Sequence, residues 1–384
     1  MHFFNLILRN TLRHKLRTSL TLLGLVVAIV AFGLLSTVVD AWYAGVDSAS
    51  SARLITRNAI SLVFPMPATY AQKIRQVDGV RGVAAANWFG GVYKDPKNFF
   101  PQLAVDVTYF GMFPEFIVDE TQMRAWLRDR KGVIVGKKLA ETYDFKIGDT
   151  VVLKGTIFPG NWEFVIRGIY SGKTPKTDVS EFFLHWEYLN ETMKRNVPRR
   201  ANQVGLYMVE LSNPSRAAEA SREIDAEFKN SLAETLTETE KAFQLGFVAM
   251  TEAIVVAIRA VSFLVIFIIL AVMANTMAMT ARERTAEYAT LKALGFAPSF
   301  VVTLIFGESL LLAFVGGAIG VALTFPVADV FGTAMGSLFP NFNVSMHTVV
   351  MQAVSAIAVG IIAALAPSRY AARVNIVDGL RSIG

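Results

Sequence analysis

Long runs of uncharged, mostly apolar residues divide this chain. Residues 18–39 and 260–281 each form a run of 22 residues between flanking charges. A third run covers residues 309–328, and the most apolar part of a fourth covers residues 348–366. At about 1.5 Å per helical residue, each run is about 30 Å long, which matches the hydrocarbon core of a bilayer. The pattern therefore predicts four transmembrane helices.

The first run has two interpretations, because basic residues precede it. It is either a membrane span or the apolar part of a secretory signal peptide. The run is longer than the apolar part of a signal peptide, and the nearest cleavage-like triplet, Val39-Asp40-Ala41, is a weak match to A-x-A. These features favour a span.

Basic residues near the ends of the runs predict the topology. Arg9, Arg13, Lys15 and Arg17 precede the first run, and the segment after the last run is also basic. Cytoplasmic loops are enriched in Lys and Arg, so we expect both termini on the cytoplasmic side of the membrane. The loop between the third and fourth runs carries only Asp329 and is expected on the other side.

This topology divides the chain into alternating membrane and aqueous segments. The expected segments are a cytoplasmic N-terminus (1–17), span one (18–41), an extracytoplasmic domain (42–252), span two (253–281), a short cytoplasmic helix (282–298), span three (299–326), an extracytoplasmic loop (327–347), span four (348–367) and a cytoplasmic tail (368–384).

The extracytoplasmic segment shows the patterns of a mixed α/β domain with a β-rich insertion. We expect strands at 132–136, 151–153 and 162–167, with a helix at 137–143 after the first of them. From Pro214 to Gly246 no Gly or Pro interrupts the chain, and apolar residues recur every fourth position. This predicts a long helix, either packed on the domain surface or serving as a stalk towards span two.

Composition then excludes several classes of function. The net charge is +6, but residues 40–252 hold 26 basic and 26 acidic residues, so the domain offers no basic surface for nucleic acid. The chain contains no cysteine, and its four histidines form no metal-binding motif, so we expect neither a metal site nor a thiol nucleophile. Residues 132–138 (GVIVGKK) differ from a phosphate-binding loop in glycine spacing and lack its Ser or Thr. We therefore expect no catalytic residues and no ATPase in this chain.

Polar and small residues inside the spans are further candidates. Glu308, near the start of span three, is either a carboxylate within reach of the cytoplasmic interface or a packing or gating group, and Asn275 in span two is a candidate for a bond across helices. Gly316-x3-Gly320 and Gly360-x3-Ala364 are small-residue patterns that let helices approach closely.

Two segments near the cytoplasmic side are more specific. Residues 282–295 read RERTAEYATLKALG, and residues 367–381 read PSRYAARVNIVDGLR. Both segments resemble those of MacB/FtsX-type permeases of ABC transporters, the mechanotransmission class. Glu308 with the following glycines, the GKKLA…KIGDT run and the order of spans are similar to the same family. The tail departs from the family, which often has Pro before its terminal Ala-Leu-Arg.

The resemblance implies what the first segment does. In the family it forms a coupling helix that docks on an ATPase, and Arg284, Glu287, Lys292 and Gly295 match its characteristic positions. On a helix, Arg284, Glu287 and Leu291 are spaced to share one face. We expect replacement of Glu287 together with Leu291 to weaken ATPase binding. The alternative is an inert amphipathic loop at the membrane surface.

The resemblance also implies partners. We expect a separate cytoplasmic ATPase that holds ATP and Mg²⁺, a second copy of the permease or a paralogue, and an optional periplasmic adaptor protein. Such a complex would export or extract a lipoprotein, lipid, peptide or drug. The alternative is an FtsX-like regulatory scaffold that activates a cell-wall hydrolase or senses a ligand.

Overall fold

The computed structural model describes residues 2–11, 13–174, 177–334, 339 and 342–376. It contains two compact units, a helical bundle and an α/β domain. The domain is formed mainly by residues 42–250, which begin in the last turns of the first long helix of the bundle and end just before the second.

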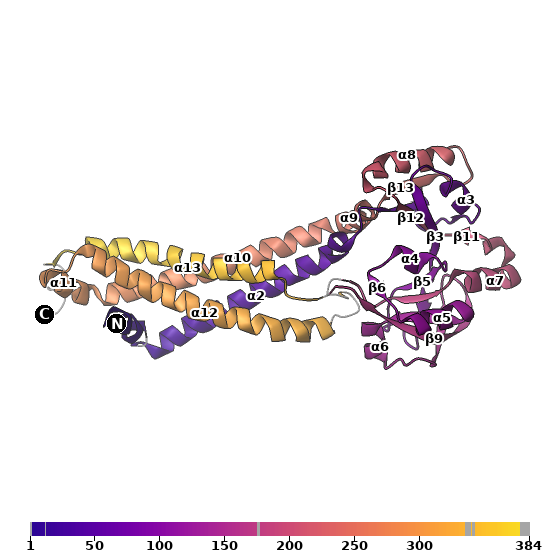
Figure 1. Ribbon diagram of the computed structural model, residues 1–384. Helices are drawn as coiled ribbons and strands as arrows, with labels where there is room; N and C mark the ends of the chain where they lie inside the picture. The colour runs from indigo at the N-terminus through magenta and orange to yellow at the C-terminus, as the bar shows by residue number, and fades with distance from the viewer. Residues whose placement is uncertain (1, 12, 175–176, 335–338, 340–341, 377–384) are drawn as a thin grey trace. The chain divides into compact units, whose positions relative to one another are not determined.

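Four helices of the described chain are long and apolar enough to cross a membrane. They are α2 (Lys15–Ser48), α10 (Glu252–Glu283), α12 (Pro298–Ala334) and α13 (Met346–Arg373). They run side by side in Figure 1 and bury an apolar core that includes Leu25, Met273 and Ala313. The four predicted spans are therefore present, and each helix extends beyond the apolar run that predicted it.

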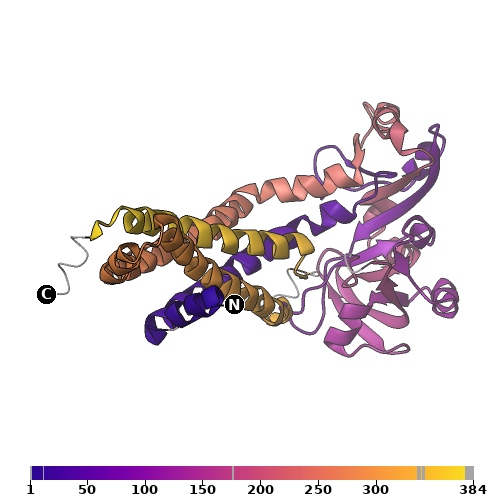
Figure 2. The same cartoon turned by 60° about the vertical axis from the view of Figure 1, so that its left-hand side comes forward.

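Two shorter helices complete the bundle. The sequence did not predict α1 (His2–Thr11), which packs against α12, as Figure 2 shows. Its Ile7 is buried with Val301 and Ala371 in a second apolar cluster. The other short helix, α11 (Thr285–Ala293), links α10 to α12 and contributes Tyr288 to the same cluster.

The domain is built on a mixed sheet. Its described strands lie in the order β13-β1-β12-β3-β5-β10-β7-β9-β8-β4, with β6 paired to β9. The pairs β5–β10 and β7–β9 are parallel, and the other pairs are antiparallel. The strands are β1 (Arg53–Asn58), β3 (Val80–Trp88), β4 (Gly91–Val92), β5 (Gln102–Val105), β6 (Phe116–Ile117), β7 (Gly132–Gly136), β8 (Thr150–Gly155), β9 (Gly160–Gly172), β10 (Phe182–His185), β12 (Leu206–Leu211) and β13 (Thr235–Thr239), with a separate pair of β2 (Met66–Pro67) and β11 (Gln203–Val204).

Helices cover the faces of this sheet. They are α3 (Tyr70–Ile74), α4 (Tyr109–Met112), α5 (Glu120–Arg128), α6 (Lys137–Tyr143), α7 (Trp186–Asn196), α8 (Ala217–Glu227) and α9 (Glu240–Met250), with short 3₁₀ turns at Pro198–Arg200 and Pro214–Arg216. Figure 1 shows α3 and α8 near β12 and β13, and α5 and α6 near β9.

Alternation along the strands places side chains on opposite faces. On β1, Leu54 packs towards α3 and α8, whereas Ile55 packs towards α4 and α5. Neighbouring residues of a strand point to opposite faces, so both faces of this part of the sheet are buried. The strands and the helix predicted at 132–136, 151–153, 162–167 and 137–143 are confirmed as β7, β8, β9 and α6.

The long helix predicted from Pro214 to Gly246 is wrong. Helix α8 ends at Glu227, Asn230 adopts a left-handed conformation with φ of 59°, and the chain returns as strand β13. Asp225 holds this reversal, because its carboxylate accepts hydrogen bonds from the Thr235 and Thr237 hydroxyls at 2.9 and 2.7 Å. The same carboxylate accepts the Thr237 backbone N–H at 3.0 Å and so blocks part of the open edge of the sheet.

Candidate coupling site

Helix α11 ends in a glycine turn. Gly295 has φ of +94°, which favours glycine. The Phe296 N–H donates to the Leu291 carbonyl at 3.1 Å, and the Gly295 N–H donates to the Lys292 carbonyl at 3.0 Å. These two bonds form the Schellman motif that ends many helices. Gly295 thus stops α11 and lets the chain turn into α12.

Arg284, between α10 and α11, lies inside the bundle rather than on its surface. Its Nη1 donates to Glu308 of α12 at 2.7 Å, and its Nε donates to Glu287 of α11 at 2.9 Å. Arg284 and Glu308 are only 7% and 5% exposed. A buried charge requires such a partner. The Arg284 guanidinium therefore links the junction of α10 and α11 to two helices, α11 through Glu287 and α12 through Glu308.

Two further arginines extend this network. Arg13, which follows α1, pairs with Glu287, and Arg17 of α2 donates to both carboxylate oxygens of Glu283 at 2.6 and 2.8 Å. Burial works against the charge of Glu287, but hydrogen bonds from Arg284 and Arg13 keep the pKa of Glu287 below its usual value. The ion pairs connect the N-terminal part of the chain to α10, α11 and α12 and match three cations with three carboxylates.

Lys292 binds the end of α13. Its ammonium group donates to the backbone carbonyls of Ala371, Ala372 and Val374 at 3.2, 2.9 and 2.9 Å. The last carbonyls of a helix have no partner within the helix and carry partial negative charge, so a lysine there is favourable. Lys292 therefore ties α11 to the last turn of α13.

The exposed part of this region is apolar. Leu291 is half-buried against the cluster that contains Tyr288, whereas Leu294 and Phe296 are 72% and 44% exposed. Both lie in the turn that Gly295 makes possible. We call Leu294, Gly295 and Phe296 the apolar turn.

A small cavity of about 30 Å³ lies beside the ion pairs. It is lined by polar groups that include Glu308, His14 and Thr280, together with Met277 and Leu312. The space is sufficient for water, and its polar lining can hydrogen-bond to it.

The glycines of the predicted packing patterns lie at close helix contacts. A Cβ atom at Gly316 would lie 2.7 Å from Leu25 Cδ2, and one at Gly320 would lie 2.8 Å from Ile29 Cβ, both on α2. A Cβ at Gly360 would lie 2.6 Å from Ala313 Cβ. Asn275 is exposed on α10 and forms no side-chain hydrogen bond with the described residues, so the expected bond across helices stays a prediction.

The structure thus assembles most of the predicted coupling residues, but not on one outward face. Arg284 and Lys292 face other parts of the bundle, and Leu291 is half-buried. The sequence alone did not pair Arg284 with Glu308, because 24 residues separate them and they lie on different elements. Phe296 was also missed, although a large apolar residue directly after a helix-ending glycine is a readable signal.

The fold and this site define a four-span membrane protein with an α/β domain between its first and second spans. The family model "MacB-like periplasmic core domain" matches residues 18–227, more than half of the chain, and "FtsX-like permease C-terminal" matches residues 259–376. The chain therefore belongs to the MacB/FtsX-type family of ABC transporter permeases, which confirms the resemblance seen in the sequence.

The chain is also similar to individual proteins. An ABC transporter permease of Methanocaldococcus jannaschii is 23% identical over 97% of this chain and 96% of its own length. The ABC transporter permease YvrN of Bacillus subtilis is 35% identical over 28% of this chain and 25% of its own length. The periplasmic region of MacB from Actinobacillus actinomycetemcomitans covers 53% of this chain and 95% of its own, with 9% identity and a TM-score of 0.39.

Proposed function

We propose that this protein is the membrane subunit of an ABC transporter and that it couples a separate cytoplasmic ATPase to movement of its α/β domain. ATP and Mg²⁺ would be held by the partner ATPase. The work would be export or extraction of a substrate on the outer side of the membrane. The ends of the bundle that carry α1, α11 and the last turn of α13 would face the cytoplasm.

The charge network around Arg284 carries this proposal. It connects α11 to α12 through Glu308 and to the N-terminal segment through Arg13, and Lys292 separately ties α11 to the end of α13. A push on α11 would therefore be shared by several helices instead of bending one loop. This is the property that a coupling helix needs.

The docking surface would be the apolar turn. Leu294 and Phe296 are exposed, whereas Glu287 and Leu291 have partners inside the bundle. Exposed apolar side chains on a rigid turn are suitable anchors for a partner groove. Replacement of Glu287 and Leu291 would disturb the bundle as well as any docking, so the apolar turn gives the sharper test.

Co-purification of the permease with its ATPase tests the proposal. We expect Leu294→Ser with Phe296→Ser to reduce ATPase recovery at least tenfold and to leave permease expression and melting temperature unchanged. Leu232→Ser is the matched control, because Leu232 is fully exposed in the α/β domain. Undiminished ATPase recovery with the double variant would show that the apolar turn is not the docking surface.

The complex is proposed to contain two permease copies. Of the four apolar helices, α10 is the least covered, with 17% of its apolar window buried compared with 33–44% for the others. This exposed face is available to a second copy or a paralogue. A periplasmic adaptor and the type of substrate stay predictions. The alternative role as a regulatory scaffold also stays a prediction, because transport and regulation require the same coupling helix.

A further inference from the structure

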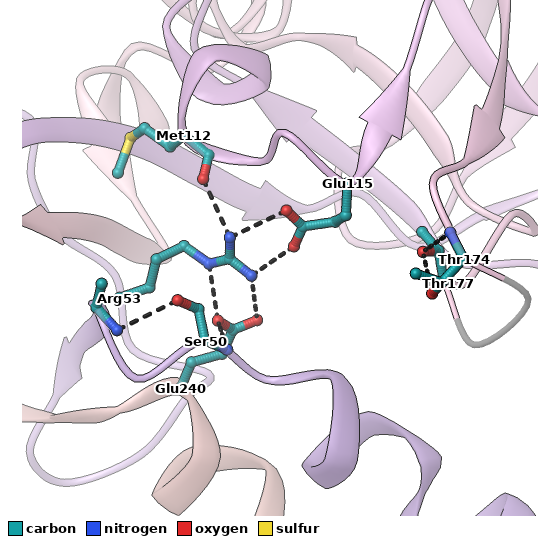
Figure 3. A network of polar contacts seen from close by, with 8 residues as sticks. Ser50, Arg53, Met112, Glu115, Thr174, Thr177 and Glu240 are labelled. Carbon is teal, nitrogen blue, oxygen red and sulfur yellow. Dashed lines mark hydrogen bonds and ion pairs between the residues drawn. The ribbon is translucent and has the colours of Figure 1, made fainter. Parts of the chain in front are cut away.

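Three segments of the α/β domain meet at one buried arginine. Arg53 opens β1 and is 5% exposed. Glu240, which opens α9, binds it on one side, and Glu115, just before β6, binds it on the other. Figure 3 shows the guanidinium between these two carboxylates.

Every N–H group of this guanidinium has an acceptor. Nε and Nη2 donate to the two oxygens of Glu240 at 2.7 and 3.3 Å, and Nη2 and Nη1 donate to the two oxygens of Glu115 at 2.5 and 3.2 Å. The fifth N–H donates to the Met112 carbonyl at 3.1 Å, and the Phe113 ring lies 4.2 Å below Arg53 Cζ. Arginine has five such donors in a rigid plane, and lysine cannot reproduce this pattern.

Arg53 and Glu240 lie close in the chain to the two long helices that flank the α/β domain. Helix α2 ends at Ser48, and the Ser50 N–H also donates to Glu240, at 2.9 Å. Helix α9, which Glu240 opens, is followed by α10. The chain that leaves the first long helix and the chain that returns to the second are therefore bound together at Arg53.

The third segment forms the wall of a pocket. Residues 109–118 supply Met112, Phe113 and Glu115 to Arg53, and the same residues supply Phe110, Phe116 and Val118 to a pocket of about 330 Å³. Met123 and Arg124 of α5 are among the residues of its other side. The pocket is shallow and open to solvent, and its volume lies at the lower end of the range for small-ligand sites.

We propose that Arg53 is a positioning residue that transmits displacement of α9 to segment 109–118 and so changes the width of the pocket. This inference rests on the proposed function, because movement of the membrane spans would be what displaces α9. The physical link is independent of that function, since it consists of contacts within the domain.

Hydrogen exchange of the full chain in detergent, without any ATPase, tests the link. The reporters are the Phe116 N–H, bonded to the Phe113 carbonyl, and the Lys173 N–H, bonded to the Glu115 carbonyl. Glu240→Gln removes the charge on α9, more than 60 residues away in sequence from either reporter. We expect both amides to exchange about tenfold faster in this variant, because a charge-assisted bond is lost.

Glu238→Gln is the matched control. Glu238 of β13 pairs with Arg57 of β1 at 3.1 Å, and the hydrogen bonds of the Arg57 guanidinium go to Glu238 and to the Asn58 carbonyl, not to segment 109–118. We expect its effect on the two reporters to be less than twofold. Arg53→Lys keeps the positive charge but loses the planar set of five N–H donors. In this background, Glu240→Gln should change the exchange rates of the two reporters by less than a further twofold.

A second readout follows the pocket itself. The chain has no cysteine, so Val118→Cys can carry a single fluorescent bimane label. Its emission should shift with Glu240→Gln and not with Glu238→Gln. Unchanged reporters with Glu240→Gln, or equal responses to both glutamate variants, would overturn the proposal. Because no ATPase is present, these outcomes leave the proposed transport function untouched.

Discussion

Single residues in the α/β domain carry unusual charge states. Glu181 precedes β10, and no cation among the described residues pairs with its carboxylate. Burial, followed by the nearby carboxylates of Asp178 and Glu240, raises the pKa of Glu181 well above 4.5. The folded domain therefore retains a proton on Glu181 at pH values at which the unfolded chain has lost it.

This pKa has a consequence for stability. A raised acid pKa in the folded state means that stability falls as pH rises from about 4.5 through the folded-state pKa. Glu181→Gln removes the titration, so we expect this variant to melt at a higher temperature than the wild type at pH 8 and at nearly the same temperature at pH 5. Glu141→Gln, at an exposed site, is the control. An equal difference at both pH values would contradict the assignment.

The buried pair of Arg284 and Glu308 gives a second prediction at this scale. Glu308→Gln would leave the Arg284 charge without its buried partner, and breaking such pairs costs about 3–5 kcal/mol. We expect a loss of this order in detergent unfolding. Arg284→Met with Glu308→Leu should lose less, because Glu287 keeps Arg13 as its partner. Wild-type stability of Glu308→Gln would show that the pair is not important for folding.

The sequence correctly predicted those helices and strands whose ends are marked by residues close to them in the chain. Strand β7 was predicted because glycines bound a run of Val and Ile, and α6 follows it directly. The helix expected from Pro214 to Gly246 failed because the four-residue repeat was accidental after Phe228. Leu232 is fully exposed in the turn and Leu236 lies on a strand. Thr235, Thr237 and Thr239 alternate as a strand requires, but the pairing with β1 that stabilises them is a long-range contact.

Packing between helices gives a prediction that ranks two glycines. An alanine Cβ at Gly316 would meet the flexible end of Leu25, whereas one at Gly360 would meet the Ala313 Cβ, which cannot rotate away. Gly360 also accepts a 2.6 Å hydrogen bond from the Ser309 hydroxyl across helices. We expect Gly360→Ala to cost about 1–3 kcal/mol and Gly316→Ala less than about 1 kcal/mol in detergent unfolding. The reverse order would contradict this packing.

At the scale of the whole molecule, the uncharged runs revealed the four spans and the insertion of the domain between the first two. The same patterns did not reveal which side chains meet inside the bundle. Arg284 and Glu308 were each selected as candidates, yet their pairing depends on how α11 folds back against α12. Membrane insertion follows from the chain's own composition, whereas contacts between helices follow from packing.

The exposed face of α10 leads to a prediction about assembly. In the cysteine-free chain, Asn275→Cys should form an intermolecular disulfide under mild oxidation if α10 faces a second copy. Phe314→Cys on α12, 71% exposed, should form much less. Non-reducing electrophoresis of membranes measures both. Equal yields would indicate random collisions rather than a defined dimer.

The five-fold bonding of Arg53 also sets a rule for chimaeric permeases. A transplanted α/β domain would have to include Ser50, Arg53 and Glu240 from the same parent, because the Ser50 N–H and the Arg53 guanidinium both donate to the Glu240 carboxylate. A junction placed a few residues further inward on either side would join an arginine to a foreign helix. Such a hybrid would still insert into the membrane, but the two segments that link its domain to the spans would no longer be hydrogen-bonded to each other.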